Sequence, residues 1–464
     1  MKTLVIIGAG FSGAVTAAQF LRHSPPDVRV VLINRSGSMA RGLAYGTNSS
    51  LHLLNVPAGN MSAYVDDPEH FLRFCQAQDL AYKASSFVPR KIYGDYLASV
   101  LDEAEKQARS NVRLERVICE VESLREDGAG AVIELSNGQQ INADQVVLAF
   151  GNFSPLDPPG FDSSLNPLRY QSDPWSGSVK PLDNEGSSVL LIGAGLTALD
   201  VSLGLLQQGH RGPIYMVSRR GLRPLPHRQQ RSPHEVPAVI TQKLLEATPS
   251  VREYLRVMRH EINLAKSQDF DWRDLLAAMR PITAQLWTRL PDTERRRFLR
   301  HLQPYWDVHR HRVAPAAYMR FEAALESGQV CSMAGRIRNV TPHSSGLTVG
   351  IELREAQQLT NIDVDRVINC TGPNTNLSRV NDTLINQLRD AGLIQPDALG
   401  LGLTLSRHLE VNDIGGRAVP WLNYIGPMLK ADLWEATAVP ELRQFAKTLA
   451  VRLAKQMNIP ASTH

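Results

Sequence analysis

The chain has 464 residues, which allows roughly two to four domains of ordinary size. Apolar residues make up 43% and charged residues 21%, so this composition fits neither a disordered chain nor a collagen-like fibre. The 50 basic and 46 acidic residues give a net charge of +4 and are interleaved, which excludes an electrostatic footprint for nucleic acid. The longest apolar runs are strand-length, far below the ~18–20 residues that a membrane span needs.

The four cysteines lie far apart and form no CxxC pair, which excludes a zinc ribbon and a thioredoxin-like redox disulfide. They are Cys75, Cys119, Cys331 and Cys370. This usage favours a reducing compartment. The first apolar run stops after four residues at a glycine-rich turn, which indicates a strand rather than a signal peptide. We therefore expect a cytoplasmic protein.

The N-terminal segment has the pattern of a dinucleotide-binding unit. Leu4–Ile7 is a run of apolar residues typical of a buried parallel strand, and it leads directly into GAGFSG at residues 8–13. Ala14–Leu21 has helix-forming composition, and Arg29–Ile33 is a second strand run. A GxGxxG turn in this strand–turn–helix–strand context predicts a nucleotide-binding turn.

Each residue of this turn has an expected part in cofactor binding. Gly8 permits the tight turn, Gly10 lets the backbone approach a pyrophosphate, and Gly13 lets the helix pack closely on the strand. Phe11 and Ser12 stand at the start of the helix, where free backbone N–H groups meet the phosphate charge.

The second strand ends without the acidic residue that commonly binds the ribose hydroxyls. Asn34 occupies that position and is followed by Arg35. An amide oxygen can accept from one hydroxyl, although without the strength of a charge-assisted bond. Arg41 is a further candidate for FAD phosphate or adenosine, while the residues that follow it, Leu43 and Tyr45, could simply pack.

The same pattern recurs in the middle of the chain. Ser188–Ile192 is a strand run, residues 193–198 read GAGLTA, Leu199–Leu206 continues as a helix, and Pro213–Val217 is the next strand. The candidate cofactor residues of this turn are Gly193, Gly195, Thr197 and Ala198.

The second of these strands ends in Ser218, Arg219 and Arg220, with no carboxylate at the ribose position. A carboxylate would repel a 2′-phosphate, whereas arginine pairs with it, so the pattern favours NADPH over NADH. The alternative is a solvated pair of arginines in a loop.

Two further segments resemble one another. Asp144–Gly151 reads DQVVLAFG and Asp365–Gly372 reads DRVINCTG. Each is a short apolar strand that ends near a glycine, so the chain can return close to a bound nucleotide through Gly151 and Gly372. Two glycine-rich units with two such return strands predict an α/β chain with two interlocked Rossmann-like dinucleotide-binding domains, each of three layers (ββα or βαβ).

With these motifs, the chain resembles two-dinucleotide-binding-domain flavoproteins, particularly the flavin-containing (class B type) monooxygenases. The resemblance is carried by GAGFSG and by Leu54–Ser62, which is similar to an Asn-led, Met-ended segment beside the flavin ring. A bacterial branch of FAD/NAD(P)-binding proteins is more similar still, through LHLLNVPAGNMS, the VHRHR stretch from Val308, and GPMLKADLWEATAVPELR from Gly426.

The resemblance implies FAD at the first glycine-rich turn and NADPH at the second. It places Asn55 near the reacting edge of the flavin as the catalytic residue, and Met61 at the end of the same segment. It also implies that Gly426 and Thr437 lie beside the flavin, where the N-terminus of the last helix would stabilise negative charge.

The resemblance further implies a monooxygenase that oxygenates an amine nitrogen or a sulfur through a C4a-hydroperoxyflavin, with O₂ and a small molecule as substrates. Two departures keep alternatives open. The FxGxxxHxxxF/W fingerprint is absent, and Gly426-Pro427 stands where Gly-Asp is usual. The alternatives are an NADPH-dependent flavin dehydrogenase or reductase, and a nucleotide-binding regulatory protein.

We assign residues 1–160 and 366–464 to the FAD-binding domain, 161–227 and 301–365 to the NAD(P)H-binding domain, and 228–300 to a helical insertion. Helical periodicity is predicted there over Ala238–Ala247, Val251–Ala265 and Trp272–Leu290. The insertion would serve either as a lid over the cofactors or as a contact in a homo-oligomer. In the cluster that holds His309 and His311, the alternatives are an anion contact and a structural loop, and the i, i+2 spacing argues against a metal site.

Overall fold

The computed structural model describes residues 1–47, 49–162, 164–176, 184–228, 239–266, 271–356 and 358–458. The chain forms two compact units. Unit 1 comprises Met1–Ser50, Val56–Asn152 and Thr375–His464, and unit 2 comprises Leu51–Asn55 and Phe153–Asn374.

Unit 1 holds the first glycine-rich turn and the C-terminal helix. Its elements are β1 (Lys2–Ile7), α1 (Phe11–His23), β2 (Val28–Asn34), α2 (Gly42–Tyr45), η1 (Ala58–Asn60), α3 (His70–Gln78), α4 (Arg90–Gln107), β3 (Arg113–Ile118), β4 (Val121–Asp127), β5 (Gly130–Leu135), β6 (Gln140–Ala143), β7 (Gln145–Leu148), η3 (Leu377–Arg379), α13 (Thr383–Asp390), β15 (Glu410–Asn412), β16 (Ala418–Tyr424), η4 (Pro427–Ala431) and α14 (Val439–Met457).

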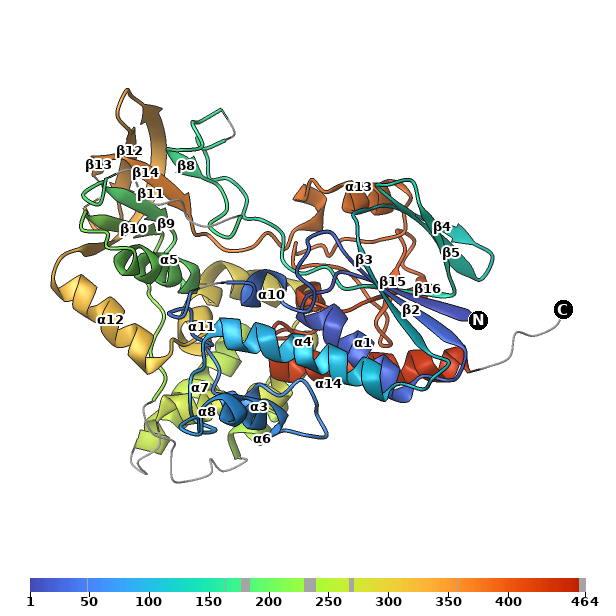
Figure 1. Cartoon of the computed structure of the whole chain (residues 1–464). Helices are drawn as coiled ribbons and strands as arrows, with labels where there is room; N and C mark the ends of the chain where they lie inside the picture. Colours follow the sequence, from blue (N-terminus) through green and yellow to red (C-terminus); the bar gives the residue numbers. More distant parts are fainter. Residues whose placement is uncertain are drawn as a thin grey trace. The chain divides into compact units, whose positions relative to one another are not determined.

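The six-stranded sheet of unit 1 has the order β15-β16-β7-β1-β2-β3. Its central strand β1 pairs in parallel with β2 and β7, and Leu4, Val5 and Ile6 are fully buried. A parallel strand covered on both faces has to be apolar throughout, which explains the unbroken run of apolar residues. Helix α1 packs against α4 and against α14 beside this sheet (Figure 1).

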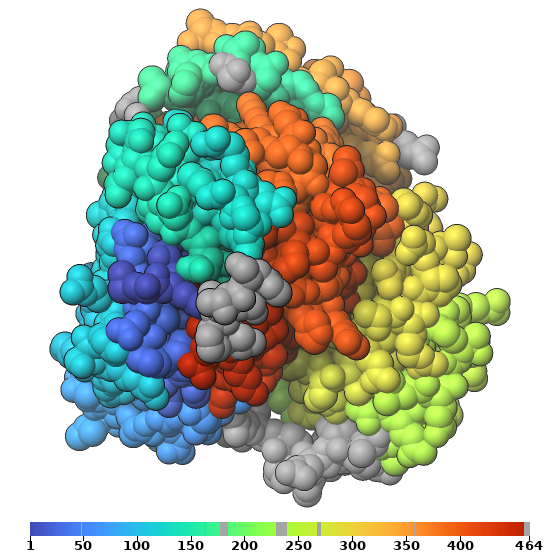
Figure 2. Space-filling view, turned by 90° about the vertical axis from the view of Figure 1, so that its right-hand side faces the viewer, coloured from blue at the N-terminus to red at the C-terminus, as the bar shows by residue number. Residues whose placement is uncertain are grey.

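A small antiparallel sheet, β4-β5-β6, forms the third layer of unit 1. Its strand β4 is bound by α13 through one side chain. The amide of Gln387 donates to the carbonyl oxygen of Leu124 and accepts from its N–H, both at 3.0 Å. Figure 2 shows the two segments, teal and orange, side by side on one face. The C-terminal part of the chain is thereby joined to the N-terminal part within one unit.

Unit 2 holds the second glycine-rich turn. Its elements are β8 (Tyr170–Gln171), β9 (Val189–Ile192), α5 (Leu196–Gln207), β10 (Ile214–Ser218), α6 (Val239–Glu246), α7 (Val251–Lys266), α8 (Trp272–Ala278), η2 (Arg280–Ile282), α9 (Thr283–Arg289), α10 (Asp292–His301), α11 (Gln303–Arg310), α12 (Pro315–Glu326), β11 (Val330–Pro342), β12 (Leu347–Leu353), β13 (Leu359–Val364) and β14 (Arg366–Asn369).

The seven-stranded sheet of unit 2 has the order β13-β12-β11-β10-β9-β14-β8. Strand β9 pairs in parallel with β10 and β14, as β1 pairs with β2 and β7 in unit 1. Both predicted return segments therefore form strands beside the strand that precedes a glycine-rich turn. The predicted α/β fold with two such units is confirmed.

The helical insertion of unit 2 has a core of its own. Buried side chains of α6 to α9, among them Leu244, Leu275 and Leu286, pack together there. The expected helix Trp272–Leu290 is interrupted by η2, where Pro281 has no N–H to donate and cannot continue an α-helix. Ala238, the first residue of another expected helix, lies outside the described residues.

The division of the chain differs from the expected one at three places. Residues 153–160, which we assign to the FAD-binding domain from the sequence, belong to unit 2, because unit 1 ends this segment at Asn152. Residues 366–374, which we had assigned to the FAD-binding domain, belong to unit 2, because β14 pairs with β9. Residues 51–55 also belong to unit 2, whereas the chain from 56 onward belongs to unit 1. In the described part of the chain, no helix is long and apolar enough to cross a membrane.

We predict that Gly13→Ala destabilises unit 1 severely. A Cβ at Gly13 would lie 1.8 Å from the carbonyl oxygen of Gly8, so the helix could not stay on its strand. We expect a loss of roughly 3 kcal/mol or more in the free energy of unfolding, read as a lower thermal midpoint. Gly37→Ala is the matched control, because a Cβ there would meet nothing within 4 Å. Equal midpoints for the two variants would contradict the packing described above.

Candidate nucleotide and flavin sites

The first glycine-rich turn depends on a close approach by the return strand. Gly8 has φ +105°, and a Cβ there would lie 2.6 Å from the carbonyl oxygen of Ala149, just after β7. Gly10 is the N-cap of α1, and no side chain caps this helix or places a carboxylate in its first turn. The first N–H groups of a helix have no partner within the helix, so this turn suits a pyrophosphate.

Phe11 and Ser12 can contribute to such a site through their backbone. Both side chains are buried, and the Phe11 ring stacks on Tyr93 at 6.4 Å between centroids. The structure also brings in Gly42, which the sequence analysis had not selected. Gly42 has φ +57°, and a Cβ there would lie 3.0 Å from the Cα of Gly10, so this loop needs glycine to pass the turn.

The polar residues expected around the first nucleotide are already engaged with the protein. The Asn34 side chain accepts from the N–H of Ala9 at 3.3 Å, and it donates to the carbonyl oxygens of Ser36 (2.7 Å) and Ser38 (3.0 Å). Asn34 therefore fastens the turn to the loop after β2, a role that the ribose argument had not included.

Both arginines near this turn form ion pairs. Arg35 lies 3.0 Å from Asp382 and 3.6 Å from Glu120, and Arg41 lies 2.5 Å from Asp95. Their charges are thus partly neutralised by the protein. A cofactor contact by either residue remains a prediction.

The second glycine-rich turn repeats the construction of the first. Gly193 has φ +116°, and a Cβ there would lie 2.4 Å from the carbonyl oxygen of Cys370, just after β14. Helix α5 begins after Gly195 with no side-chain cap and no acidic residue in its first turn. Ala198 is fully buried, as a small residue packed on the strand must be, while Thr197 is half-buried. This turn is likewise suited to an anion.

The residues after β10 separate into different roles. The Ser218 hydroxyl accepts from the N–H of Gly221 at 3.1 Å. Arg220 donates to the carbonyl oxygen of Arg300 at 3.1 Å and lies over the Tyr305 ring. Arg219 is exposed and makes no ion pair or hydrogen bond within the described residues. Of the two expected phosphate ligands, Arg219 is therefore the available one.

The glycines of the return strands border open space. A Cβ at Gly151 or at Gly372 would meet no atom within 4 Å. Gly426 is different, because with φ +152° a Cβ there would lie 2.5 Å from the Tyr424 hydroxyl and 3.0 Å from the Phe150 carbonyl oxygen. Packing alone requires glycine at 426. Thr437 is exposed just before α14, so it is accessible to a ligand.

Asn55 is placed by a histidine that the sequence analysis had not selected. The Nε2 of His227 lies 2.8 Å from the backbone carbonyl oxygen of Asn55, and the carbonyl can only accept, so Nε2 carries the proton. The Asn55 side chain is half-buried, while Met61, at the end of the same segment, is buried. His227 lies in a proline- and arginine-rich stretch with no motif around it, so the sequence offered little signal for this contact.

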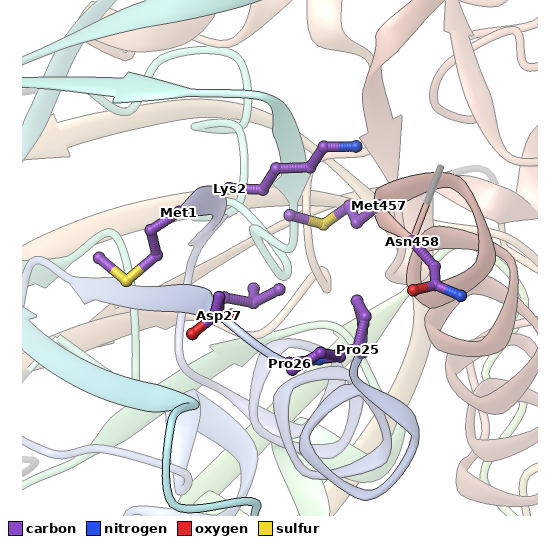
Figure 3. A pocket seen from close by; sticks show the side chains of 8 residues that line it. Met1, Lys2, Pro25, Pro26, Asp27, Met457 and Asn458 are labelled. Carbon is purple, nitrogen blue, oxygen red and sulfur yellow. The ribbon is translucent and has the colours of Figure 1, made fainter. Parts of the chain in front are cut away.

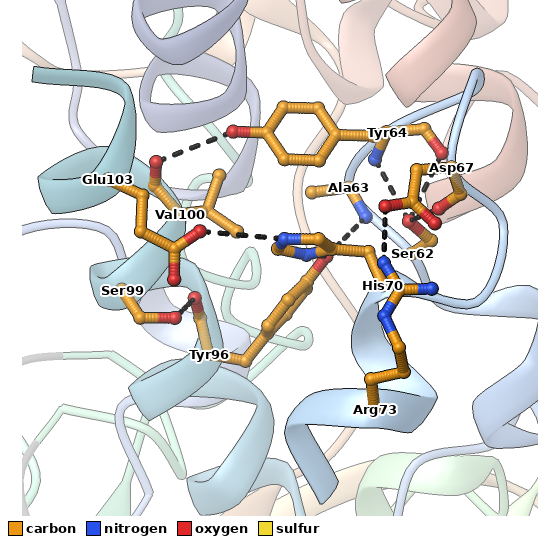
Figure 4. Close-up of polar contacts among 10 residues, drawn as sticks. All are labelled: Ser62, Ala63, Tyr64, Asp67, His70, Arg73, Tyr96, Ser99, Val100 and Glu103. Carbon is orange, nitrogen blue, oxygen red and sulfur yellow. Dashed lines mark hydrogen bonds and ion pairs between the residues drawn. The ribbon is translucent and has the colours of Figure 1, made fainter. Parts of the chain in front are cut away.

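A polar network in unit 1 holds the chain from residue 62 onward against α4 (Figure 4). The Tyr96 hydroxyl accepts from the N–H of Ala63 and lies 3.0 Å from Nδ1 of His70. Nε2 of His70 lies 3.5 Å from Glu103. The Tyr96 hydroxyl can accept from Ala63 and still share a hydrogen bond with Nδ1 of His70. Tyr96 of α4 therefore holds this part of the chain through the main chain of Ala63 and the side chain of His70.

The His309 and His311 cluster is tied into the helical insertion. Nδ1 of His309 donates to the carbonyl oxygen of Tyr305 at 2.7 Å, and its ring packs edge-on against Trp272. His311 lies 3.8 Å from Asp307. Among the described residues, no group of three or more potential ligands is arranged to hold a metal ion.

A cavity of about 260 Å³ in unit 1 lies away from the turn (Figure 3). It is lined by Met1, Pro25, Asp27, Met457 and Asn458, among others, at the amino end of β1. Nucleotides bind at the carboxyl ends of parallel strands, which is where Gly8 lies. This cavity is therefore not the expected cofactor site.

Residues 5–153 match the family described as FAD-NAD(P)-binding. No curated protein matches the sequence. The match covers the first glycine-rich turn, the Asn-led segment and the first return strand, and it agrees with the expected class of cofactors, FAD together with a nicotinamide dinucleotide.

Solved structures similar to the chain include two hydroxylases and a reductase. The reduced form of ornithine hydroxylase from Pseudomonas aeruginosa has a TM-score of 0.62 and 14% identity, over 99% of this chain and 100% of that one. Ornithine N-hydroxylase from Kutzneria sp. 744, with reduced FAD, NADP⁺ and L-ornithine, has a TM-score of 0.62 and 13% identity, over 98% and 99%. Thioredoxin reductase from T. acidophilum has a TM-score of 0.53 and 11% identity, over 98% and 99%.

At these identities the likeness concerns the fold. The chain has the fold of the flavoproteins with two dinucleotide-binding domains, as the sequence predicted. The residue assignments made above stay predictions.

We predict that Gly195→Ala weakens NADP⁺ binding at the second glycine-rich turn without changing the stability of the fold. A Cβ at Gly195 would meet no protein atom within 4 Å, so we expect an unchanged thermal midpoint. The methyl group would instead occupy space that a pyrophosphate needs, so NADP⁺ affinity should fall roughly tenfold or more, measured by calorimetric titration. Gly37→Ala, with equally open surroundings and no expected part in cofactor binding, is the control. Undiminished NADP⁺ binding by Gly195→Ala would contradict this assignment.

We predict that lowering the pH reduces the free energy of unfolding of unit 2, because His227 takes up a proton more readily when unfolded. Burial lowers the pKa of His227 from its ordinary 6.5 to about 4, and the charge of Arg312 adds to this effect. The imidazole is therefore neutral in the folded state, and stability is lost as the pH falls from 6.5 toward 4, because the unfolded state binds the proton more readily. Between pH 7.5 and pH 5 we expect a loss of about 1–2 kcal/mol that is absent from His227→Gln, measured by chemical denaturation. Exposed His343, replaced by Gln, is the control. The same loss in wild type and His227→Gln would contradict the assignment.

Proposed function

We propose that the protein is an FAD-dependent, NADPH-consuming oxidoreductase that acts as a monooxygenase on a soft nucleophile, an amine nitrogen or a sulfur. The observation that carries this proposal is the repetition of one construction. Gly8 and Gly193 each take a positive φ under the carbonyl of a return strand, and each turn leads to an uncapped helix. Two such turns in one chain suit two dinucleotides, and the matched family binds FAD and NAD(P).

In this proposal the first turn, in unit 1, holds the pyrophosphate of FAD, and the second, in unit 2, holds that of NADPH. Arg219 selects NADPH, because it is exposed and lacks a partner within the described residues. A guanidinium group can bind a 2′-phosphate through two hydrogen bonds. Arg220 would have to leave the Arg300 carbonyl to take the same role.

Bound FAD would supply the redox chemistry, by taking two electrons from NADPH and reacting with O₂. The protein's part is to bind, orient and exclude water. Asn55 is the proposed hydrogen-bond donor at the reacting edge of the flavin. Its backbone is held by His227, and its half-buried amide has no hydrogen-bond partner among the described residues. Such an amide can be aimed at a ligand without first breaking a bond to the protein.

The second candidate function is an NADPH-dependent flavin dehydrogenase or reductase. The absence of the monooxygenase fingerprint favours it, and thioredoxin reductase from T. acidophilum shares the fold. In that case Asn55 would have no special part in the reaction with O₂. The two candidates therefore differ in what the Asn55 side chain does.

Asn55→Ala tests the proposal. The purified protein is loaded with FAD and supplied with NADPH in air, and hydrogen peroxide release is measured per NADPH consumed. A missing hydrogen bond of ~0.5–1.5 kcal/mol should raise this release roughly two- to tenfold. Asn142→Ala, which changes an exposed residue of β6, should leave it unchanged.

Equal peroxide release by wild type and Asn55→Ala would overturn the monooxygenase assignment and favour the reductase. If neither FAD nor NADPH bound at all, the oxidoreductase assignment itself would be wrong.

A further inference from the structure

A stretch of unit 2 just after β10 is held between α8 and the loop that follows α11. The N–H of Val313 donates to the carbonyl oxygen of Leu225, and the N–H of His227 donates to that of Val313, both at 2.9 Å. From the other side, Nε of Arg273 donates to the carbonyl oxygen of Pro226 at 3.1 Å. Three segments far apart in the sequence therefore form one hydrogen-bonded piece.

Part of the charge gathered here is compensated. Arg228 lies 3.3 Å from Asp271 and 3.0 Å from Asp274, and Arg273 lies 3.0 Å from Asp271. The two carboxylates thus already serve two guanidinium groups. Asp271 also caps the N-terminus of α8, so its position is fixed.

Arg312 has no ion-pair partner of its own among the described residues. The Nε of Arg312 is buried and has no hydrogen-bond partner within the described part of the chain. Burial, together with the neighbouring charges of Arg310 and Arg273, lowers the pKa of Arg312 to about 10, so it stays positive at neutral pH. Asp271 and Asp274 act on Arg312 in the opposite sense, but neither forms an ion pair with it, and both are already paired with other arginines. A partly buried guanidinium with a buried, unpartnered Nε is costly unless an anion completes the site.

Arg312 is connected to Asn55 through His227, whose N–H donates to the carbonyl oxygen of Val313, the residue after Arg312. The ring of His227 donates to the Asn55 carbonyl oxygen, and the charge of Arg312 acts directly on that ring. The imidazole is neutral and adds no positive charge of its own. An anion at Arg312 would therefore lie beside the backbone that positions Asn55.

We propose that Arg312, with Arg310 beside it, binds the carboxylate of an acidic substrate and thereby sets its position next to Asn55. The proposal rests on the proposed function in one respect, namely that Asn55 marks the reacting edge of the flavin. Arginine suits this role because its planar fork matches the two oxygens of a carboxylate. The substrate class is then a small organic acid that also carries the amine or sulfur to be oxidised.

A phosphate of the nicotinamide dinucleotide has the same oxyanion chemistry and is the other possible source. The second glycine-rich turn and Arg219 already provide for the phosphates of that cofactor, which favours the substrate. The experiment below separates the two sources.

The test measures anion binding to the FAD-loaded protein without NADPH, at constant ionic strength. Succinate, inorganic phosphate and neutral succinamide are titrated, and the thermal midpoint is recorded. We expect succinate, but not succinamide, to raise the midpoint of wild type saturably. Arg312→Gln should weaken succinate binding ~10- to 100-fold. Arg259→Gln should not, because Arg259 is exposed on α7 and forms no hydrogen bond or ion pair with another described residue.

Folding is controlled in the same experiment. Without anion, Arg312→Gln should unfold at or above the midpoint of wild type, because a poorly compensated buried charge has been removed. Arg312→Lys keeps the charge but loses the fork, and should bind succinate with intermediate affinity; it also provides the comparison if the glutamine variant does not fold.

Three results would overturn the proposal. The first is that succinate does not raise the thermal midpoint of wild type saturably. The second is that wild type and Arg312→Gln bind succinate equally well. The third is that only phosphate raises the midpoint of wild type, while Arg312→Gln binds NADP⁺ more weakly than wild type. The last would assign the site to the dinucleotide. None of these readings depends on oxygenation, so failure of the monooxygenase assignment in the Asn55 experiment remains a separate result.

Discussion

The structure depends on one steric constraint that occurs twice. In each unit a return strand brings a backbone carbonyl so close to the first glycine of the turn that a Cβ would lie 2.6 Å (Ala149 to Gly8) or 2.4 Å (Cys370 to Gly193) from its oxygen. The strand can then pair in parallel with the one before the turn, and the turn delivers the start of a helix at the carboxyl edge of the sheet. Because these helices begin without a side-chain cap, their free N–H groups are kept for a ligand.

Most of the polar and charged side chains discussed around these turns are already bound to other groups of the protein. Asn34 is fastened to the main chain, Arg35 and Arg41 face carboxylates, and Arg220 donates to a carbonyl oxygen. Surface ion pairs of this kind contribute little to stability, but they reduce what a side chain has left for a cofactor. The exception around the nucleotide turns is Arg219, which has no partner in the described part of the chain. The residues proposed to bind a cofactor thus differ mainly in whether their side chains are already engaged with the protein, and less in residue type.

The Asn-led segment, Leu54–Ser62, is divided between the two units. Residues 51–55 belong to unit 2, where His227 binds the Asn55 carbonyl, while the chain from 56 onward belongs to unit 1, where the network around Tyr96 and His70 holds it. Arg312 lies near His227, is partly buried, and has no ion-pair partner in the described chain. In the proposals made above, Arg312 would bind the substrate's carboxylate, while His227 holds the backbone of Asn55 and so orients its amide. Binding and orientation would then depend on different residues.

The sequence alone determined the elements whose residues interact locally. The strand–turn–helix units at Gly8 and Gly193, the two return strands and the helical character of the insertion could all be predicted, because short apolar runs, glycine spacing and helical periodicity are local properties. Only the tertiary structure decided that Arg366–Asn369 belongs to unit 2 and that Gly42 passes Gly10. It also decided that His227 binds the Asn55 carbonyl and bonds to Val313, the residue after Arg312. These contacts join residues from 32 to 177 positions apart in the sequence. No local pattern encodes such pairings, since each depends on how separate segments pack and on which charges the folded chain has already compensated.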